Sequence, residues 1–162
     1  MSRPTLRRSG PGEERSAAAP LRPHVVFTSG GVAFAFDAVH ARYVLRGDKR
    51  GPEGLVHFLD QPYPVVDLRQ VFGHPAPART GFVVLVESRV RAGLHVDDLR
   101  GLCRIDPGGL APLPAVYRGT ERRWIAGLVP TDDTVDDTVI VVVRIAEMLE
   151  TLLSGDGLGA VQ

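Results

Sequence analysis

Cysteine is nearly absent from this 162-residue chain, which holds a single one, Cys103. One thiol cannot build a disulfide framework or a thiolate metal site, so neither is expected to stabilise the fold. Cys103 alternates with Leu102 and Arg104 as a strand residue would, and no histidine lies near it in the sequence. We therefore expect a small buried hydrophobic residue at this position rather than a nucleophile.

Long apolar runs and an excess of one charge are missing as well. No stretch reaches the roughly 20 apolar residues of a membrane-spanning helix, and the N-terminal segment lacks the apolar centre of a signal peptide. The chain has 19 Lys and Arg against 19 Asp and Glu, and its ten aromatic residues are scattered. Nothing therefore predicts binding to nucleic acid or insertion into a membrane, and we expect a soluble cytoplasmic protein.

The sequence motifs of common enzymes are also lacking. There is no Walker loop, nucleophile elbow or dinucleotide fingerprint, and the five histidines lie in five separate segments. One acidic cluster remains, formed by Asp132, Asp133, Asp136 and Asp137, and its oxygens could hold Ca²⁺ or Mg²⁺. Its spacing is not that of an EF-hand, so a solvated connection between strands is favoured over a metal-dependent enzyme. We expect no catalytic residue and no cofactor.

Composition divides the chain into three parts. Residues 1–23 contain five Arg and four Pro and almost no large apolar residue, so burial cannot offset the entropy of ordering them. We expect a disordered Arg/Pro-rich tail over 1–23, one folded domain over 24–153 and a frayed C-terminus over 154–162.

The folded part is dominated by short apolar segments separated by turn residues, which predicts an all-β fold, a barrel or a sandwich. We place these strands in two groups, one before and one after about residue 90. Val139 to Val143 is apolar at five successive positions, which indicates a strand buried on both faces. The final segment follows a helical period and predicts the only long helix. The expected strands span residues 25–28, 32–36, 42–46, 82–87, 90–96, 101–105, 124–129 and 139–143.

The stretch from Gln61 to Gly73 is the most specific in the chain. Val65 and Val66 form a short β-branched strand that leads into Asp67, a residue type that caps helices. A helical turn carrying Leu68, Val71 and Phe72 should follow and end at Gly73.

The segment Pro64 to Leu68 resembles a strand-to-helix junction of the CheW-like family, the adaptor proteins of bacterial chemosensory arrays. Further segments resemble this family in the same order along the chain, and together they cover nearly all of residues 24–153. They are Val26-Phe-Thr28 with Phe34-Ala-Phe-Asp37, Ala92-Gly-Leu-His-Val-Asp97, Gly101 to Ile105, Leu110-Ala-Pro-Leu-Pro114, Trp124-Ile-Ala-Gly-Leu128 and Val139 to Leu149.

This resemblance implies a specific fold and function. The fold would be two interleaved five-stranded SH3-like barrels with short helical turns, a C-terminal helix and a hydrophobic groove between the barrels. The protein would be a non-catalytic adaptor at cytoplasmic receptor arrays. Its partners would be the cytoplasmic domain of a methyl-accepting chemoreceptor, the regulatory domain of a CheA-type histidine kinase, or another CheW-like protein.

Several positions depart from the family pattern. The family's "G-V-x-N-L-R-G" becomes Gly54 to Asp60 here, with His57 for Asn, Leu59 for Arg and Asp60 for Gly, and a frequent Glu becomes Tyr43. Replacing the guanidinium by Leu59 removes bidentate pairing with a carboxylate and leaves apolar contact.

The connection between Tyr43 and Gly54 is also shorter than is usual in the family. These departures favour a divergent, single-domain accessory member, similar to adaptors of the Frz type, that binds receptors with reduced coupling to the kinase. The alternative is an ordinary coupler that links receptor and kinase. The expected partner-binding residues, lining the receptor groove, are Tyr43, Val56, Phe58, Leu59, Asp60, Gly93 and His95.

Overall fold

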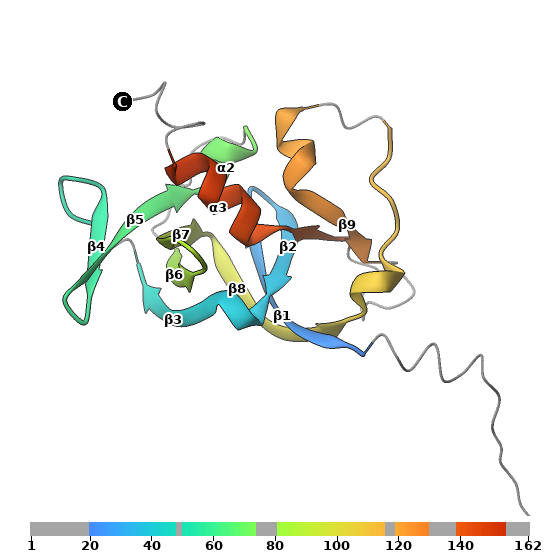
Figure 1. Ribbon diagram of the computed structural model, residues 1–162, viewed down its shortest axis with the longest axis horizontal. Coiled ribbons are helices and arrows are strands. Elements are labelled where there is room, and N and C mark those ends of the chain that lie inside the picture. The colour runs from blue at the N-terminus through green and yellow to red at the C-terminus, as the bar shows by residue number, and fades with distance from the viewer. Residues whose placement is uncertain (1–19, 48–49, 74–80, 116–118, 130–138, 155–162) are drawn as a thin grey trace, which may run out of the picture.

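The computed structural model describes residues 20–47, 50–73, 81–115, 119–129 and 139–154. Ten strands form two five-stranded sheets, with short helices between them (Figure 1). The first sheet has the order β8-β1-β2-β10-β9 and the second has the order β3-β6-β7-β5-β4. The predicted all-β architecture of two five-stranded units is confirmed. The Asp cluster at 132–137, the tail to residue 19 and the C-terminus from 155 lie outside the described residues.

The first sheet combines strands from both ends of the chain. Its members are β1 (Arg22–Ser29), β2 (Val32–Asp37), β8 (Asp98–Ile105), β9 (Ile125–Val129) and β10 (Ile140–Val143). Gly30 and Gly31 have φ angles of 62° and 81°, so they make the tight turn between β1 and β2. β10 then runs parallel to β2, which places a C-terminal strand beside an N-terminal one.

The second sheet is built from the middle of the chain. It contains β3 (Ala41–Arg46), β4 (Leu55–Phe58), β5 (Gln61–Asp67), β6 (Phe82–Glu87) and β7 (Arg91–Val96). β5 and β7 are parallel, whereas the other neighbours in this sheet are antiparallel. The two units are therefore interleaved, and the simple division of strands at about residue 90 is wrong because pairing joins distant segments.

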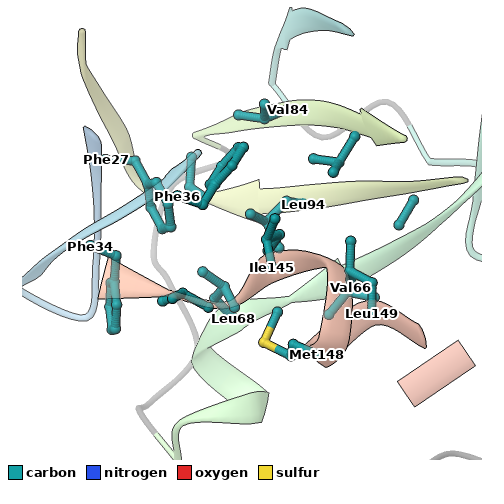
Figure 2. Packing of buried hydrophobic residues seen from close by; sticks show 14 of the residues in the cluster. Phe27, Phe34, Phe36, Val66, Leu68, Val84, Leu94, Ile145, Met148 and Leu149 are labelled. Carbon is teal, nitrogen blue, oxygen red and sulfur yellow. The ribbon is translucent and has the colours of Figure 1, made fainter. Parts of the chain in front are cut away.

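One apolar cluster lies between the sheets and includes the C-terminal helix. Figure 2 shows Phe27, Phe34 and Phe36 of the first sheet facing Val84 and Leu94 of the second, with helix α3 (Ile145–Leu153) beside them. Within α3 the residues Ile145, Met148, Leu149 and Leu152 are buried, which confirms the helical period read from the sequence. Each unit also has a smaller apolar cluster of its own in its interior, one in the first sheet and one in the second.

Three sequence expectations need correction. β1 begins at Arg22, inside the segment expected to be disordered, because Arg22 and Pro23 pair with Ile105 and Arg104 of β8. The buried apolar strand begins at Ile140, since Val139 is exposed. Cys103, expected to be buried, is only half-buried. It lies on β8, the last strand of its sheet, and the Cys103 side chain packs at the margin of a core cluster.

Candidate functional site

The strand-to-helix junction forms as its residues predict. Asp67 ends β5 and its carboxylate accepts a hydrogen bond of 3.0 Å from the backbone N–H of Arg69, which caps helix α2 (Leu68–Val71). Leu68 is fully buried, and Phe72 stacks on Phe34 of the first sheet with ring centroids 5.0 Å apart. This segment therefore helps to hold the two units together.

Asp97, between β7 and β8, is a second structural connection. The guanidinium of Arg69 donates to both of its carboxylate oxygens, with an Nε–Oδ1 distance of 2.9 Å, and the backbone N–H of Gly30 donates to Oδ2 at 2.9 Å. Burial alone would raise the pKa of Asp97, but these hydrogen bonds and the nearby positive charge outweigh it, so the pKa is lowered. One carboxylate thus connects α2 to the β1–β2 turn.

Three of the expected partner-binding residues lie inside the protein. Val56 is 2% exposed within the interior cluster of the second sheet. His95 is 4% exposed and its Nδ1 lies 3.6 Å from a carboxylate oxygen of Asp67. A Cβ on Gly93 would lie 2.8 Å from Cγ1 of Val83, so this glycine permits close packing of β6 and β7. These three positions do not line an exposed groove, because Val56 faces the interior cluster and both faces of β7, which carries Gly93 and His95, are covered.

The other four expected residues come together at the outer strands of the second sheet. Tyr43 on β3 stacks on Phe58 of β4 with ring centroids 4.6 Å apart, although β3 and β4 are opposite edges of that sheet. Leu59 and Asp60 follow Phe58 directly at the tip of the β4–β5 hairpin, and Leu59 is 80% exposed. Tyr43 is half-exposed, whereas Phe58 packs against the interior cluster. We call Tyr43, Phe58, Leu59 and Asp60 the seam surface, since they lie where the two edges of the sheet meet.

The tip of this hairpin is strained. Leu59 and Asp60 have φ angles of 50° and 63°, and they are the only non-glycine residues with positive φ among those the structure describes. Phe58 and Gln61 pair on either side, so the loop is a two-residue turn of the kind that favours Asn-Gly. An exposed leucine in left-handed conformation is unfavourable, and such strain is found most often at functional sites.

A polar network joins three strands of the second sheet. Glu87 on β6 accepts a hydrogen bond of 2.8 Å from the buried hydroxyl of Tyr63 and lies 3.5 Å from the guanidinium of Arg42. Burial and the adjacent carboxylate raise the pKa of Tyr63, which keeps its hydroxyl protonated as a donor. Sequence reasoning missed this network, because the partners lie on three different strands.

The described residues contain no group of three or more His, Cys, Asp or Glu side chains that could hold a metal ion. Among them, too, no helix is long and apolar enough to cross a membrane. The arrangement can present shape, apolar area and charge to another protein.

Comparison with known proteins agrees with this assessment. A profile of the CheW-like domain family matches residues 23–152, which is most of the chain. Among solved structures, the chain is similar to the scaffolding protein TtCheW from Thermoanaerobacter tengcongensis. The TM-score is 0.59 and the identity 22%, over 76% of this chain and 88% of that chain. No curated protein sequence matches at a significant level.

Proposed function

The chain belongs to the CheW-like domain family, and from that membership we propose that it is a non-catalytic adaptor that binds the cytoplasmic tips of chemoreceptors. The protein would act in the cytoplasm at a bacterial chemosensory array. It would hold its partners in place without transforming a substrate. The match of the family profile over residues 23–152 supports the adaptor class, and the seam surface supports the mode of binding.

The exposed tip beside the Tyr43–Phe58 stack is the observation that carries this proposal. Leu59 projects from a two-residue turn and is 80% exposed, so a partner can enclose it on nearly all sides. Burying a leucine contributes about 1.5–3 kcal/mol, and the adjacent half-exposed ring of Tyr43 adds apolar area. In Figure 1 the turn of the β4–β5 hairpin lies at the left end of the molecule, whereas the other end of β5 reaches helix α3.

We further propose that coupling to the kinase is reduced, as in accessory CheW-like proteins of the Frz type. Leu59 cannot form the bidentate pair with a carboxylate that an arginine would form, so partners that depend on that pair are disfavoured. The short connection between Tyr43 and Gly54 removes further surface from the same end of the second sheet. Receptor contact through apolar area is retained.

Separate binding experiments test both parts. The full chain would be titrated by calorimetry with a chemoreceptor cytoplasmic fragment and, independently, with the regulatory domain of a CheA-type kinase. We expect binding to the receptor fragment and weak or undetectable binding to the kinase domain. Leu59→Arg should change receptor affinity without changing stability, because the side chain is exposed. Val39→Arg, a change at an exposed residue of helix η2 (Ala38–His40), is the matched control and should have no effect.

Each outcome distinguishes one alternative. Equal binding to receptor and kinase would support an ordinary coupler and contradict reduced coupling. A large fall in melting temperature for Leu59→Arg would show that the residue supports the fold rather than a partner. Lack of receptor binding by the parent chain would contradict the adaptor role itself.

A further inference from the structure

A hollow of about 400 Å³ lies in the first sheet, far in the sequence from the seam surface. Its walls combine the C-terminal half of β8 with the segment that leads toward β9. Apolar side chains from four parts of the chain line it, namely Leu21, Ile105, Leu110 and Val129. Ligand sites in proteins have volumes of about 300–1,000 Å³, so the volume of this hollow is within the range of binding sites.

One wall of the hollow is the open edge of a strand. β8 is the terminal strand of its sheet, and within the described residues its strand pairing is with β1 alone. Arg104 is paired with Pro23, which has no N–H to donate, so the backbone groups of Arg104 are directed away from β1. The edge of β9 is covered differently, because Ala111 exchanges two backbone hydrogen bonds of 2.8 Å with Leu128. An added strand would therefore pair with β8.

The two faces of β8 differ in chemistry along this edge. Cys103 and Ile105 face the hollow, and Cys103 packs against the core cluster there. Leu102 and Arg104 alternate with them along the strand. Leu102 is 71% exposed, and Arg104 is exposed as well and borders the hollow. Among the described residues Arg104 has no carboxylate within salt-bridge distance, while the carboxylate of Asp106 accepts the N–H of Gly108 at 2.9 Å. The edge thus presents apolar side chains together with the positive charge of Arg104 at the border of the hollow.

We propose that this edge and hollow form a second docking site, which takes an extended, acidic segment of a partner protein by addition of a strand to β8. Alternate residues of that segment would be apolar and enter the hollow. The residues between them would carry a carboxylate beside Arg104 and an apolar side chain over Leu102. Backbone hydrogen bonds supply affinity in such complexes, and the alternating side chains supply specificity.

Charge complementarity favours this occupant over a second copy of the chain. An antiparallel pair of β8 strands centred on Leu102 would place Arg104 opposite Arg100 of the other copy, twice in each dimer. Like charges directly opposite each other destabilise a strand pair. A carboxylate at the same position is attracted instead.

Cys103 provides a direct assay, because it is the only cysteine in the chain and lines the hollow. The full chain would react with the neutral reagent 4,4′-dithiodipyridine, which releases one coloured thiopyridone for each thiol modified. The rate would be measured alone and with the blocked peptide Glu-Val-Leu-Val-Glu, whose two valines face the hollow when its leucine lies over Leu102. At ten times the dissociation constant of the peptide, the rate should fall by about tenfold, because only the unbound fraction reacts. The matched peptide Gln-Val-Leu-Val-Gln should protect less at the same concentration.

Two variants test the role of the charge. Arg104→Gln should remove the difference in protection between the two peptides. In the absence of peptide, the reaction rate of Cys103 in this variant should stay within about twofold of the parent rate, because arginine and glutamine are both polar side chains at an exposed position. Arg89→Gln, which changes an arginine on the β6–β7 connection that is 87% exposed, should preserve the difference.

Four results would overturn the proposal. The first is a Cys103 reaction rate that the acidic peptide leaves unchanged at millimolar concentration. The second is equal protection by the two peptides. The third is a peptide preference that survives Arg104→Gln. The last is a rate that falls with protein concentration in the absence of peptide, because that would assign the hollow to a second copy of the chain.

Discussion

Replacing the hairpin tip by Asn-Gly should make the protein more stable and a poorer adaptor. In the double variant Leu59→Asn/Asp60→Gly, both turn positions receive the residues that a two-residue turn with positive φ favours. A left-handed conformation costs an ordinary residue about 1–2 kcal/mol, and less for Asp, whose short polar side chain tolerates it. The added glycine lowers the free energy of unfolding by about 0.5–1 kcal/mol, because glycine has more conformational freedom in the unfolded chain. The net gain is about 1 kcal/mol, because Leu59 is 80% exposed and its removal loses little burial.

Equilibrium unfolding in urea measures this gain, with the fluorescence of the single tryptophan, the buried Trp124, as the probe. A gain of about 1 kcal/mol would raise the melting temperature by about 2–4 °C. Affinity for the chemoreceptor fragment should fall about tenfold or more, since the leucine that the partner encloses is lost. A variant that is no more stable would refute the strain argument. A variant that binds the receptor as well as the parent would refute the role of Leu59.

Three further changes test the structural account. Asp97→Asn should lower stability at pH 7 by about 1.5–3 kcal/mol through weaker bonding to Arg69. The pKa of Asp97 in the folded protein is lowered below its value of about 3.9 in the unfolded chain. The ionised carboxylate therefore stabilises the folded protein above about pH 4, and this contribution is lost as the pH falls through the folded pKa. The unfolding curves of parent and variant should converge over that pH range. Ile140→Ala should lower the free energy of unfolding by about 2–5 kcal/mol, because Ile140 is buried in the interior cluster of the first sheet. Phe72→Ala should lower it by an amount at the lower end of that range, because the ring of Phe72 is half-buried. Thermal unfolding measures both changes. Calorimetric titration with Ca²⁺ or Mg²⁺ should give no heat, and saturable binding would revive the metal site at Asp132, Asp133, Asp136 and Asp137.

Local sequence patterns were sufficient for most elements of the fold. The Asp67 cap, the helical turn after it and the period of helix α3 are formed by neighbouring residues, and the structure confirms them. The strand pattern was equally clear, because alternation and turn glycines act over a few residues. Membership of a particular sheet was not readable in this way. The parallel pairing of β10 with β2 joins residues more than a hundred positions apart, and only the family resemblance implied interleaving.

Four of the residues expected to bind a partner lie together in the structure, and their binding role stays a prediction. They are Tyr43, Phe58, Leu59 and Asp60 at the seam, and the sequence alone does not show that β3 meets β4. His95 was misplaced, because a polar residue in an alternating strand is normally exposed. Here Asp67 contacts its ring from the neighbouring strand, so the histidine stays inside.

The other misplaced residues have different causes. Val56 faces the interior of the second sheet, and an alternating pattern does not tell which face of a strand another strand will cover. Gly93 was taken for a surface position, whereas its missing side chain allows Val83 and Val65 to approach. The strained turn went unrecognised because neither Leu59 nor Asp60 is a glycine.

Titration of the intact chain with a chemoreceptor cytoplasmic fragment, in parallel with its Leu59→Arg variant, tests the adaptor role most directly. The parent chain should bind with a saturable heat, and the variant should bind with a different affinity while unfolding at the same temperature. Absence of a heat with the parent chain, under conditions where its unfolding remains cooperative, would contradict the proposal that this surface holds a receptor.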